Sequence, residues 1–307
     1  MINVALVFPG QGAQKVGMGK EFYEASPQAK KLFDEAERIL NNDLVDVIFN
    51  GPSEKLTSTA YCQPAIFTFS MAALKAFQAH PKFKNISVKF TAGLSLGEYS
   101  ALMASHALSF QDTLKLVETR SRLMEEATQL AKGTMAAIIG FEKEKLLGIC
   151  RVTGAEVANF NSPQQIVITG DTEKVAEACV AIRAAGAKSV IPLDVSGAFH
   201  SSLMKPAADR FKDALKSVRI SKAVIPVISN VDGKPEVEPE HIRSNLAKQI
   251  TSSVQWVDTV NIIASQGVQT FIEVGPGKVL TGLIKRINAN VGLYNIEKPE
   301  DIEKLPF

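Results

Sequence analysis

A serine flanked by glycines lies between a predicted strand and a predicted helix. The apolar pattern of residues 87–92 indicates a strand, and a helix is expected from Glu98 onward. The residues between them, Gly93-Leu94-Ser95-Leu96-Gly97, have the G-x-S-x-G spacing of a nucleophile elbow. Such a turn strains the serine and needs small residues where the strand and the helix crowd it. The motif therefore predicts a nucleophilic Ser95. The alternative is a tight turn in which the serine only caps the helix.

Strand, turn and helix patterns alternate along most of the chain, which indicates an α/β fold with a mostly parallel sheet. An almost wholly apolar pattern over residues 64–79 predicts a buried helix with Pro64 as its first residue. Residues 133–195 have a different predicted order, strand-helix-strand-strand-helix-strand, which is that of a ferredoxin-like unit. We therefore expect a hydrolase-like large domain with an inserted ferredoxin-like (βαββαβ) domain, the first formed by residues 1–130 and 197–307 and the second by 131–196.

A serine nucleophile needs a base, and the chain has only four histidines. Three of them lie where a catalytic role is not expected: at a polar helix end (His80), on the helix after the serine (His106) and at an acidic helix start (His241). His200 lies in a loop of small residues at the expected domain junction, where ligand sites concentrate. We therefore predict His200 as the base for Ser95, although a lone histidine is more often structural. No orienting carboxylate is obvious, so a backbone or amide oxygen could hold the imidazole.

Arg120 lies at the centre of the apolar face of a helix predicted over about residues 110–130. That face is formed by four large apolar side chains, Leu116, Val117, Leu123 and Met124. A buried guanidinium is costly unless it has an anionic partner. Three interpretations are open: a side chain that reaches solvent, an internal ion pair, or a cleft arginine that binds a carboxylate with two hydrogen bonds. In the third case the group that Ser95 carries would itself bear a free carboxylate.

Composition and charge exclude several classes of function. Lys plus Arg (34) nearly balance Asp plus Glu (32), so no net field indicates nucleic acid or a membrane surface as a partner. No apolar stretch approaches the ~20 residues needed to span a bilayer, and the N-terminal apolar run is too short for a signal peptide. We therefore expect a cytoplasmic protein. The three cysteines are far apart and odd in number, which predicts free thiols and no metal or redox site.

Seven short segments carry a resemblance that covers essentially the whole chain. They are Phe8-Pro9-Gly10-Gln11-Gly12, Gly93 to Ala101, Glu118 to Arg122, Asn159-Phe160-Asn161-Ser162-Pro163, Phe199 to Pro206, Gln255-Trp256, and Glu273-Val274-Gly275-Pro276-Gly277. Each segment is weak alone, but in this order and spacing they resemble the malonyl-CoA:acyl-carrier-protein transacylase family of type II fatty-acid synthesis. One position departs from the family pattern, because Leu94 stands where the family usually has a histidine before the nucleophile.

The resemblance implies a ping-pong acyl transfer for fatty-acid biosynthesis. Ser95 would take malonyl from malonyl-CoA as an ester and pass it to the phosphopantetheine thiol of acyl carrier protein. His200 would act as general base and then as general acid, with the main-chain carbonyl of Gln249 orienting its ring. Coenzyme A thioester is then a substrate, and no cofactor is expected. The partners would be malonyl-CoA and acyl carrier protein, with no nucleic acid and no membrane, and we expect a monomer.

The resemblance also implies the remaining site residues. The backbone N–H groups of Gln11 and Leu96 would form the oxyanion hole, and Arg120 would bind the malonyl carboxylate. Three further residues would contact the substrate, Gln63, Asn161 and Phe199. Phe199 before the histidine resembles the malonyl-preferring form of the motif rather than the methylmalonyl form.

Three competing functions remain open from the sequence. A serine hydrolase would use the same elbow with water as the acceptor and would need no buried arginine. A non-catalytic module that binds acyl carrier protein would use Ser95 only as a helix cap. Phosphate binding at Gly275-Pro276-Gly277-Lys278 is disfavoured, because the full P-loop spacing is missing.

Overall fold

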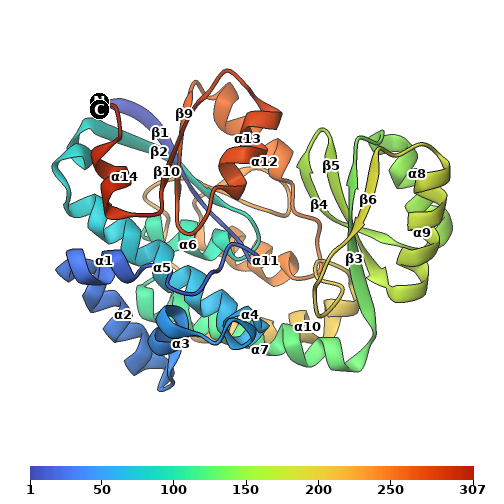
Figure 1. Ribbon diagram of the computed structural model, residues 1–307, viewed down its shortest axis with the longest axis horizontal. Helices are drawn as coiled ribbons and strands as arrows, with labels where there is room; N and C mark the ends of the chain where they lie inside the picture. Colours follow the sequence, from blue (N-terminus) through green and yellow to red (C-terminus); the bar gives the residue numbers. More distant parts are fainter.

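The computed structural model describes residues 1–307 and contains two separate sheets (Figure 1). The larger sheet is parallel except for its last pair of strands. Its strands, in spatial order, are β10 (Gly292–Ile296), β9 (Thr270–Val274), β1 (Ile2–Phe8), β2 (Ile86–Gly93), β7 (Val227–Ile228) and β8 (Pro235–Glu236). The molecule is therefore a mixed α/β protein with a mostly parallel sheet, as the alternating pattern predicted.

Helices cover both faces of the larger sheet. One face carries α1 (Lys20–Ala25), α2 (Pro27–Leu40), α3 (Leu44–Asn50), α4 (Ser53–Thr57), α5 (Thr59–Ala79), α6 (Gly97–Ala104), α7 (Phe110–Leu130), α10 (Lys205–Ser217), α11 (Pro239–Gln249) and α14 (Pro299–Glu303). The other face carries α12 (Trp256–Ser265) and α13 (Val279–Ile287). Successive side chains of β1 enter opposite cores, Val4 and Leu6 on the first face and Ala5 and Val7 on the second. This explains why β1 is apolar without alternation.

Helix α5 is buried along most of its length, as predicted, but it begins at Thr59 and not at Pro64. Pro64 lies inside the helix, where it cannot donate a backbone hydrogen bond. The sequence placed the start of the helix too late because proline usually marks a first turn. Here the contacts of a largely buried helix outweigh the missing bond.

The smaller sheet is antiparallel and lies beside the larger one (Figure 1). Its strand order is β4 (Glu156–Ser162), β5 (Gln165–Asp171), β3 (Gly133–Ile139) and β6 (Ser189–Pro192). Helices α8 (Lys143–Thr153) and α9 (Thr172–Ala184) pack on it around a core of their own. The element order along the chain is the predicted one. Strand β4 joins the two parts, because Phe160 N–H donates to the carbonyl of Val254 at 2.9 Å and Val254 N–H donates to Ala158 at 2.8 Å.

Two sequence-based predictions about composition can be compared with the fold. None of the helices combines the length and hydropathy that crossing a bilayer requires. The three cysteines are free and buried, which confirms the prediction of unpaired thiols.

Candidate active site

The predicted elbow is present between the end of β2 at Gly93 and the start of α6 at Gly97. Ser95 has a φ of 54°, a left-handed conformation that few non-glycine residues adopt. The flanking glycines are required by space: a Cβ on Gly93 would lie 2.0 Å from the carbonyl carbon of Gly97, and one on Gly97 would lie 2.0 Å from the oxygen of Phe8. The strand, the helix and β1 therefore meet without room for a side chain, and Ser95 is held in the strained turn.

Replacing Gly97 with alanine is expected to destabilise the fold by about 3 kcal/mol or more, because the new methyl group meets backbone that cannot move aside. The free energy of urea unfolding measures this loss. Gly148→Ala is the matched control, since Gly148 lies in α8 with no atom within 4 Å of an added Cβ. That change should raise stability by about 0.5–1 kcal/mol. Equal effects at the two positions would contradict the steric argument.

Ser95 and His200 are in direct contact. Ser95 Oγ lies 2.8 Å from His200 Nε2. On the other side of the ring, Nδ1 donates to two backbone carbonyls, Gln249 at 2.9 Å and Ser252 at 3.0 Å. These two acceptors keep the proton on Nδ1, so the lone pair of Nε2 faces the serine hydroxyl. The backbone thus supplies the support that the sequence could not assign to a carboxylate.

The environment of His200 favours the neutral imidazole. Burial and the positive charge of Arg120 lower the pKa of His200 from 6.5 to about 4, although hydrogen bonds to Gln249 and Ser252 act in the opposite direction. His200 is only 4% exposed, so little solvent stabilises a charged ring. A neutral ring at physiological pH can accept the proton of Ser95.

The reactivity of Ser95 should therefore fall on acidification with a midpoint near pH 4, since the protonated ring cannot act as a base. The measurement is the rate at which a neutral fluorophosphonate labels Ser95 across a pH series, with the fold monitored by circular dichroism. In Arg120→Gln the midpoint should move to higher pH, because the cation that lowers the pKa of His200 is gone. A midpoint near 6.5 in both proteins would contradict this electrostatic assignment.

Arg120 is fully inside the protein, and its guanidinium is directed at the serine. It is 1% exposed and donates from Nη1 to Gln63 Oε1 at 2.6 Å, and from Nη2 to Ser95 Oγ at 2.9 Å and Gln249 Oε1 at 3.1 Å. No carboxylate lies within ion-pair distance, and Nε has no partner. The interpretations as a solvent-reaching side chain or an internal ion pair are therefore wrong. All its hydrogen-bond partners are neutral, and the buried Glu98 acts on it only through space, which leaves the guanidinium available to bind an anion.

Most of the predicted site residues line a single cavity of about 220 Å³ beside Ser95. Among its walls are Gln11, Ser95, Leu96, Arg120, Asn161, Phe199 and His200. Gln63 and Gln249 do not line this cavity, but their side-chain oxygens accept hydrogen bonds from the guanidinium of Arg120. The carboxamide oxygen of Asn161, one of the lining residues, is buried and has no hydrogen-bond partner.

The two backbone groups predicted for the oxyanion hole are unoccupied donors. Neither Gln11 N–H nor Leu96 N–H donates a hydrogen bond within the protein. The turn that carries Gln11 packs tightly on the elbow, because a Cβ on Gly10 would lie 2.5 Å from the carbonyl oxygen of Leu94. Gln11 lies in the turn after β1 and Leu96 in the elbow itself, both residues line the cavity beside Ser95, and their amides are free to bind an anionic oxygen.

Comparison with known proteins places this site in a family. The family model described as "Acyl transferase domain" matches residues 5–292. The malonyl CoA-acyl carrier protein transacylase of Bacillus subtilis (strain 168) is 46% identical over 308 residues, which cover 99% of this chain and 96% of the relative. The chain belongs to the malonyl CoA-acyl carrier protein transacylase family. It is accordingly an acyltransferase.

Solved structures are similar to this transacylase-family chain over its whole length. The crystal structure of acyl-carrier-protein-S-malonyltransferase from Bartonella henselae is 40% identical, with a TM-score of 0.94 over 99% of this chain and 98% of the other. A second structure holds a malonyl-transacylase in complex with a type II PKS acyl-carrier protein. It is 39% identical, with a TM-score of 0.94 over 98% of each chain.

Two polar residues of the candidate site were missed by sequence reasoning. Asn230 accepts from Ser95 N–H at 2.6 Å and donates to the carbonyl of Gly93 at 2.7 Å, so its side chain closes the elbow. Glu98, which follows the elbow directly, is fully buried and contacts Gln249. A signal for Asn230 was available, because it follows the short apolar segment that forms β7 and so lies at the carboxyl edge of the sheet.

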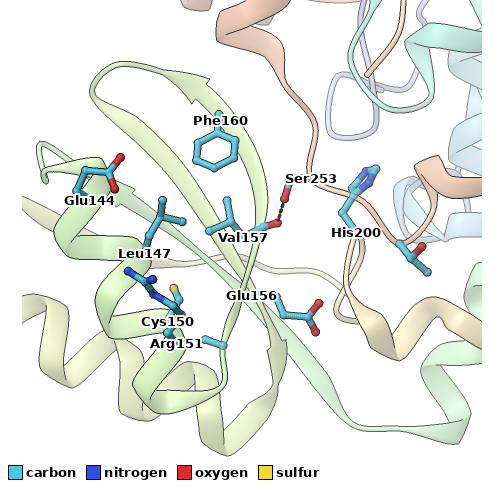
Figure 2. Close-up of a pocket in the computed structure, with 11 residues that line it drawn as sticks. Glu144, Leu147, Cys150, Arg151, Glu156, Val157, Phe160, His200 and Ser253 are labelled. Carbon is cyan, nitrogen blue, oxygen red and sulfur yellow. Dashed lines mark hydrogen bonds between the residues drawn. The ribbon is translucent and has the colours of Figure 1, made fainter. Parts of the chain in front are cut away.

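A second cavity, of about 480 Å³, lies on the other side of His200, between β4, α8 and the loop at residues 251–253 (Figure 2). Figure 2 shows Leu147, Cys150 and Val157 on the wall opposite His200. Ser253 donates its hydroxyl to the carbonyl of Val157, so the loop that holds the imidazole is bonded to the smaller sheet. The position of His200 therefore depends on how the smaller sheet packs against the transacylase core.

Proposed function

We propose that this protein transfers malonyl from malonyl-CoA to the phosphopantetheine thiol of acyl carrier protein, as a step of fatty-acid biosynthesis. The observation that carries the proposal is the convergence on one atom: Ser95 Oγ lies 2.8 Å from His200 Nε2 and 2.9 Å from Arg120 Nη2. A nucleophile, a base and an unpaired buried cation in one cavity suit an acyl group that bears a carboxylate. The printed names of the relatives and the complex with an acyl-carrier protein support the same donor and acceptor.

In the first half-reaction, His200 Nε2 takes the proton of Ser95 as Oγ attacks the thioester carbonyl of malonyl-CoA. The tetrahedral oxyanion accepts hydrogen bonds from Gln11 N–H and Leu96 N–H. Collapse breaks the carbon–sulfur bond, and the imidazolium returns its proton to the coenzyme A thiolate, which leaves a malonyl ester on Ser95. The carbonyl of Gln249 stabilises the charged ring through Nδ1–H while it exists.

In the second half-reaction the same groups act in the opposite direction. His200 deprotonates the phosphopantetheine thiol of acyl carrier protein, the thiolate attacks the ester, and the proton returns to Ser95. The guanidinium of Arg120 binds the malonyl carboxylate in both halves, oriented by its hydrogen bonds to Gln63 and Gln249. Two residues of the cavity wall, Asn161 and Phe199, complete the contacts to the acyl group.

The test is to incubate the protein with malonyl-CoA and measure its mass. A covalent gain of one malonyl group on Ser95 is expected, and this adduct should disappear when holo acyl carrier protein is added and appear on the carrier. Release of free malonate at the same rate without carrier protein would favour a serine hydrolase. No adduct at all would favour a non-catalytic binding module. Either result would overturn the proposal.

We also propose a division of the chain into two domains, a hydrolase-like catalytic domain of residues 1–130 and 197–307 and an inserted ferredoxin-like domain of residues 131–196. The antiparallel order β4-β5-β3-β6 and a hydrophobic core formed within residues 136–182 support the insertion. Three properties stay predictions. The protein is expected to be monomeric, to be cytoplasmic, and to use coenzyme A only as part of its substrate without holding a cofactor.

A further inference from the structure

Glu98 is a buried carboxylate at the start of α6 that the proposed mechanism does not use. It has no exposed surface, and its two oxygens accept from two different segments. Oε1 accepts from the backbone N–H of Asn230 at 3.1 Å, and Oε2 accepts from Nε2 of Gln249 in a short hydrogen bond. One side chain thus joins the helix after the elbow, the turn after β7 and the end of α11.

Gln249 extends this connection to all three groups of the candidate active site. Its backbone carbonyl accepts from Nδ1 of His200 at 2.9 Å. Its side-chain oxygen accepts from Arg120 at 3.1 Å, and its Nε2 also donates to the carbonyl of Ser95 at 2.8 Å. Because the bond to Glu98 fixes which way the carboxamide points, it fixes which end faces the guanidinium and which faces the elbow.

Asn230 forms a second connection from the same carboxylate. Its backbone N–H donates to Glu98, and its side chain holds both ends of the elbow, Ser95 N–H at 2.6 Å and the carbonyl of Gly93 at 2.7 Å. The two oxygens of Glu98 therefore act on the nucleophile from two directions, through Asn230 on one side and Gln249 on the other.

A second buried carboxyl, Glu236 in β8, acts on Glu98 through its charge. Burial raises the pKa of both groups, and the charge of Glu236 raises that of Glu98 further. Glu236 accepts from Asn245 at 2.8 Å, but its other oxygen is buried without a partner, whereas both oxygens of Glu98 accept from N–H donors. A proton on either oxygen of Glu98 would face an N–H donor, so these two hydrogen bonds favour the carboxylate even though burial raises its pKa.

We propose that Glu98 is a positioning residue for acyl transfer, which sets through Gln249 the relative places of the nucleophile, the base and the guanidinium. This inference rests on the proposed function for its choice of substrate. It does not require that Glu98 touch the substrate. A carboxylate is needed at this position because a glutamine offers one acceptor and one N–H₂ group, so one of the two facing N–H donors would meet another donor.

The test compares Glu98→Gln with Glu236→Gln, which makes the same change in the other buried carboxyl. In Glu98→Gln the kcat/KM for malonyl transfer should fall about 10- to 100-fold, because the reacting groups lose their alignment. The preference for malonyl-CoA over acetyl-CoA should fall as well, since the carboxamide that orients Arg120 is released. Glu236→Gln should keep the wild-type rate and preference. If both variants behave alike, or if Glu98→Gln slows both donors by the same factor, the inference is wrong.

A double-mutant cycle separates positioning from general stability. Gln249→Glu sets two carboxylates against each other and should be severely impaired, whereas Glu98→Gln combined with Gln249→Glu restores an amide–carboxylate bond with its ends exchanged. The double variant should be more active than Gln249→Glu alone, and additive losses would overturn the inference. Labelling of Ser95 by a fluorophosphonate gives a readout that does not depend on malonyl-CoA. A wild-type protein that reacts with the probe but not with malonyl-CoA would contradict the proposed function only.

Discussion

Replacing Ser95 with alanine is expected to abolish acyl transfer, with a fall in kcat of about 10⁵- to 10⁶-fold, as in enzymes whose nucleophile and base act as a unit. The side-chain oxygen is the atom on which His200 and Arg120 converge, and no other hydroxyl shares these contacts. Without this oxygen no covalent intermediate forms. The free N–H donors then have no oxyanion to stabilise, even when the substrate is bound. Intact-mass measurement after incubation with malonyl-CoA should show the unmodified protein.

Ser100→Ala is the matched control for this experiment. Ser100 lies on α6, a few residues after Ser95, and its hydroxyl is buried without a hydrogen-bond partner. Its removal therefore leaves no group unsatisfied, and the variant should acquire malonyl at the wild-type rate. A Ser95→Ala protein that still gains a malonyl group, or a Ser100→Ala protein that does not, would contradict the assignment of the nucleophile.

The contact between Ser95 and His200 could be predicted because each residue had a local signal. The glycine spacing around Ser95 marks a turn that only small neighbours permit, and the few histidines left one in a suitable loop. Helical periodicity placed Arg120 on the apolar face of its helix but left open whether the side chain reaches solvent. Its partners could not be predicted, since they come from α5, the elbow and the end of α11, which periodicity within one helix cannot reveal.

The support of the site could not be predicted, because it consists of contacts between distant segments. Asn230 reaches Ser95 across 135 positions, and Gln249 reaches it across 154. Glu98 follows the elbow directly, yet nothing in the local pattern shows that an acidic residue in the first turn of a helix is buried rather than solvated. Such contacts arise where three elements pack together. The sequence can place Asn230 after an apolar segment, but it does not show which groups its side chain contacts.

Removal of the Arg120 side chain should reduce the preference for malonyl over acetyl donors more than any other change. In Arg120→Ala the kcat/KM for malonyl-CoA is expected to fall about 10²- to 10³-fold, the scale for losing one partner of a buried charge pair. Acetyl-CoA has no carboxylate for the guanidinium to bind, so its transfer should change far less. Parallel assays at pH 8 keep His200 neutral in both proteins. This pH lies above the pKa of about 4 that burial and Arg120 give the ring, and above its ordinary value of 6.5.

Two further variants on the same helix decide whether the effect arises from the clamp. Arg122 is 47% exposed and pairs with Glu118 and Glu126, so Arg122→Ala should leave both donors unaffected. Arg120→Lys keeps the charge but not the planar pair of donors, and it should recover only part of the preference for malonyl-CoA. Equal losses for the two donors in Arg120→Ala would mean that the guanidinium supports Ser95 and not the acyl carboxylate. The two roles of Arg120 predict different results. Loss of its hydrogen bond to Ser95 would slow transfer from every donor alike, whereas loss of a contact to the acyl carboxylate would slow transfer from malonyl-CoA alone.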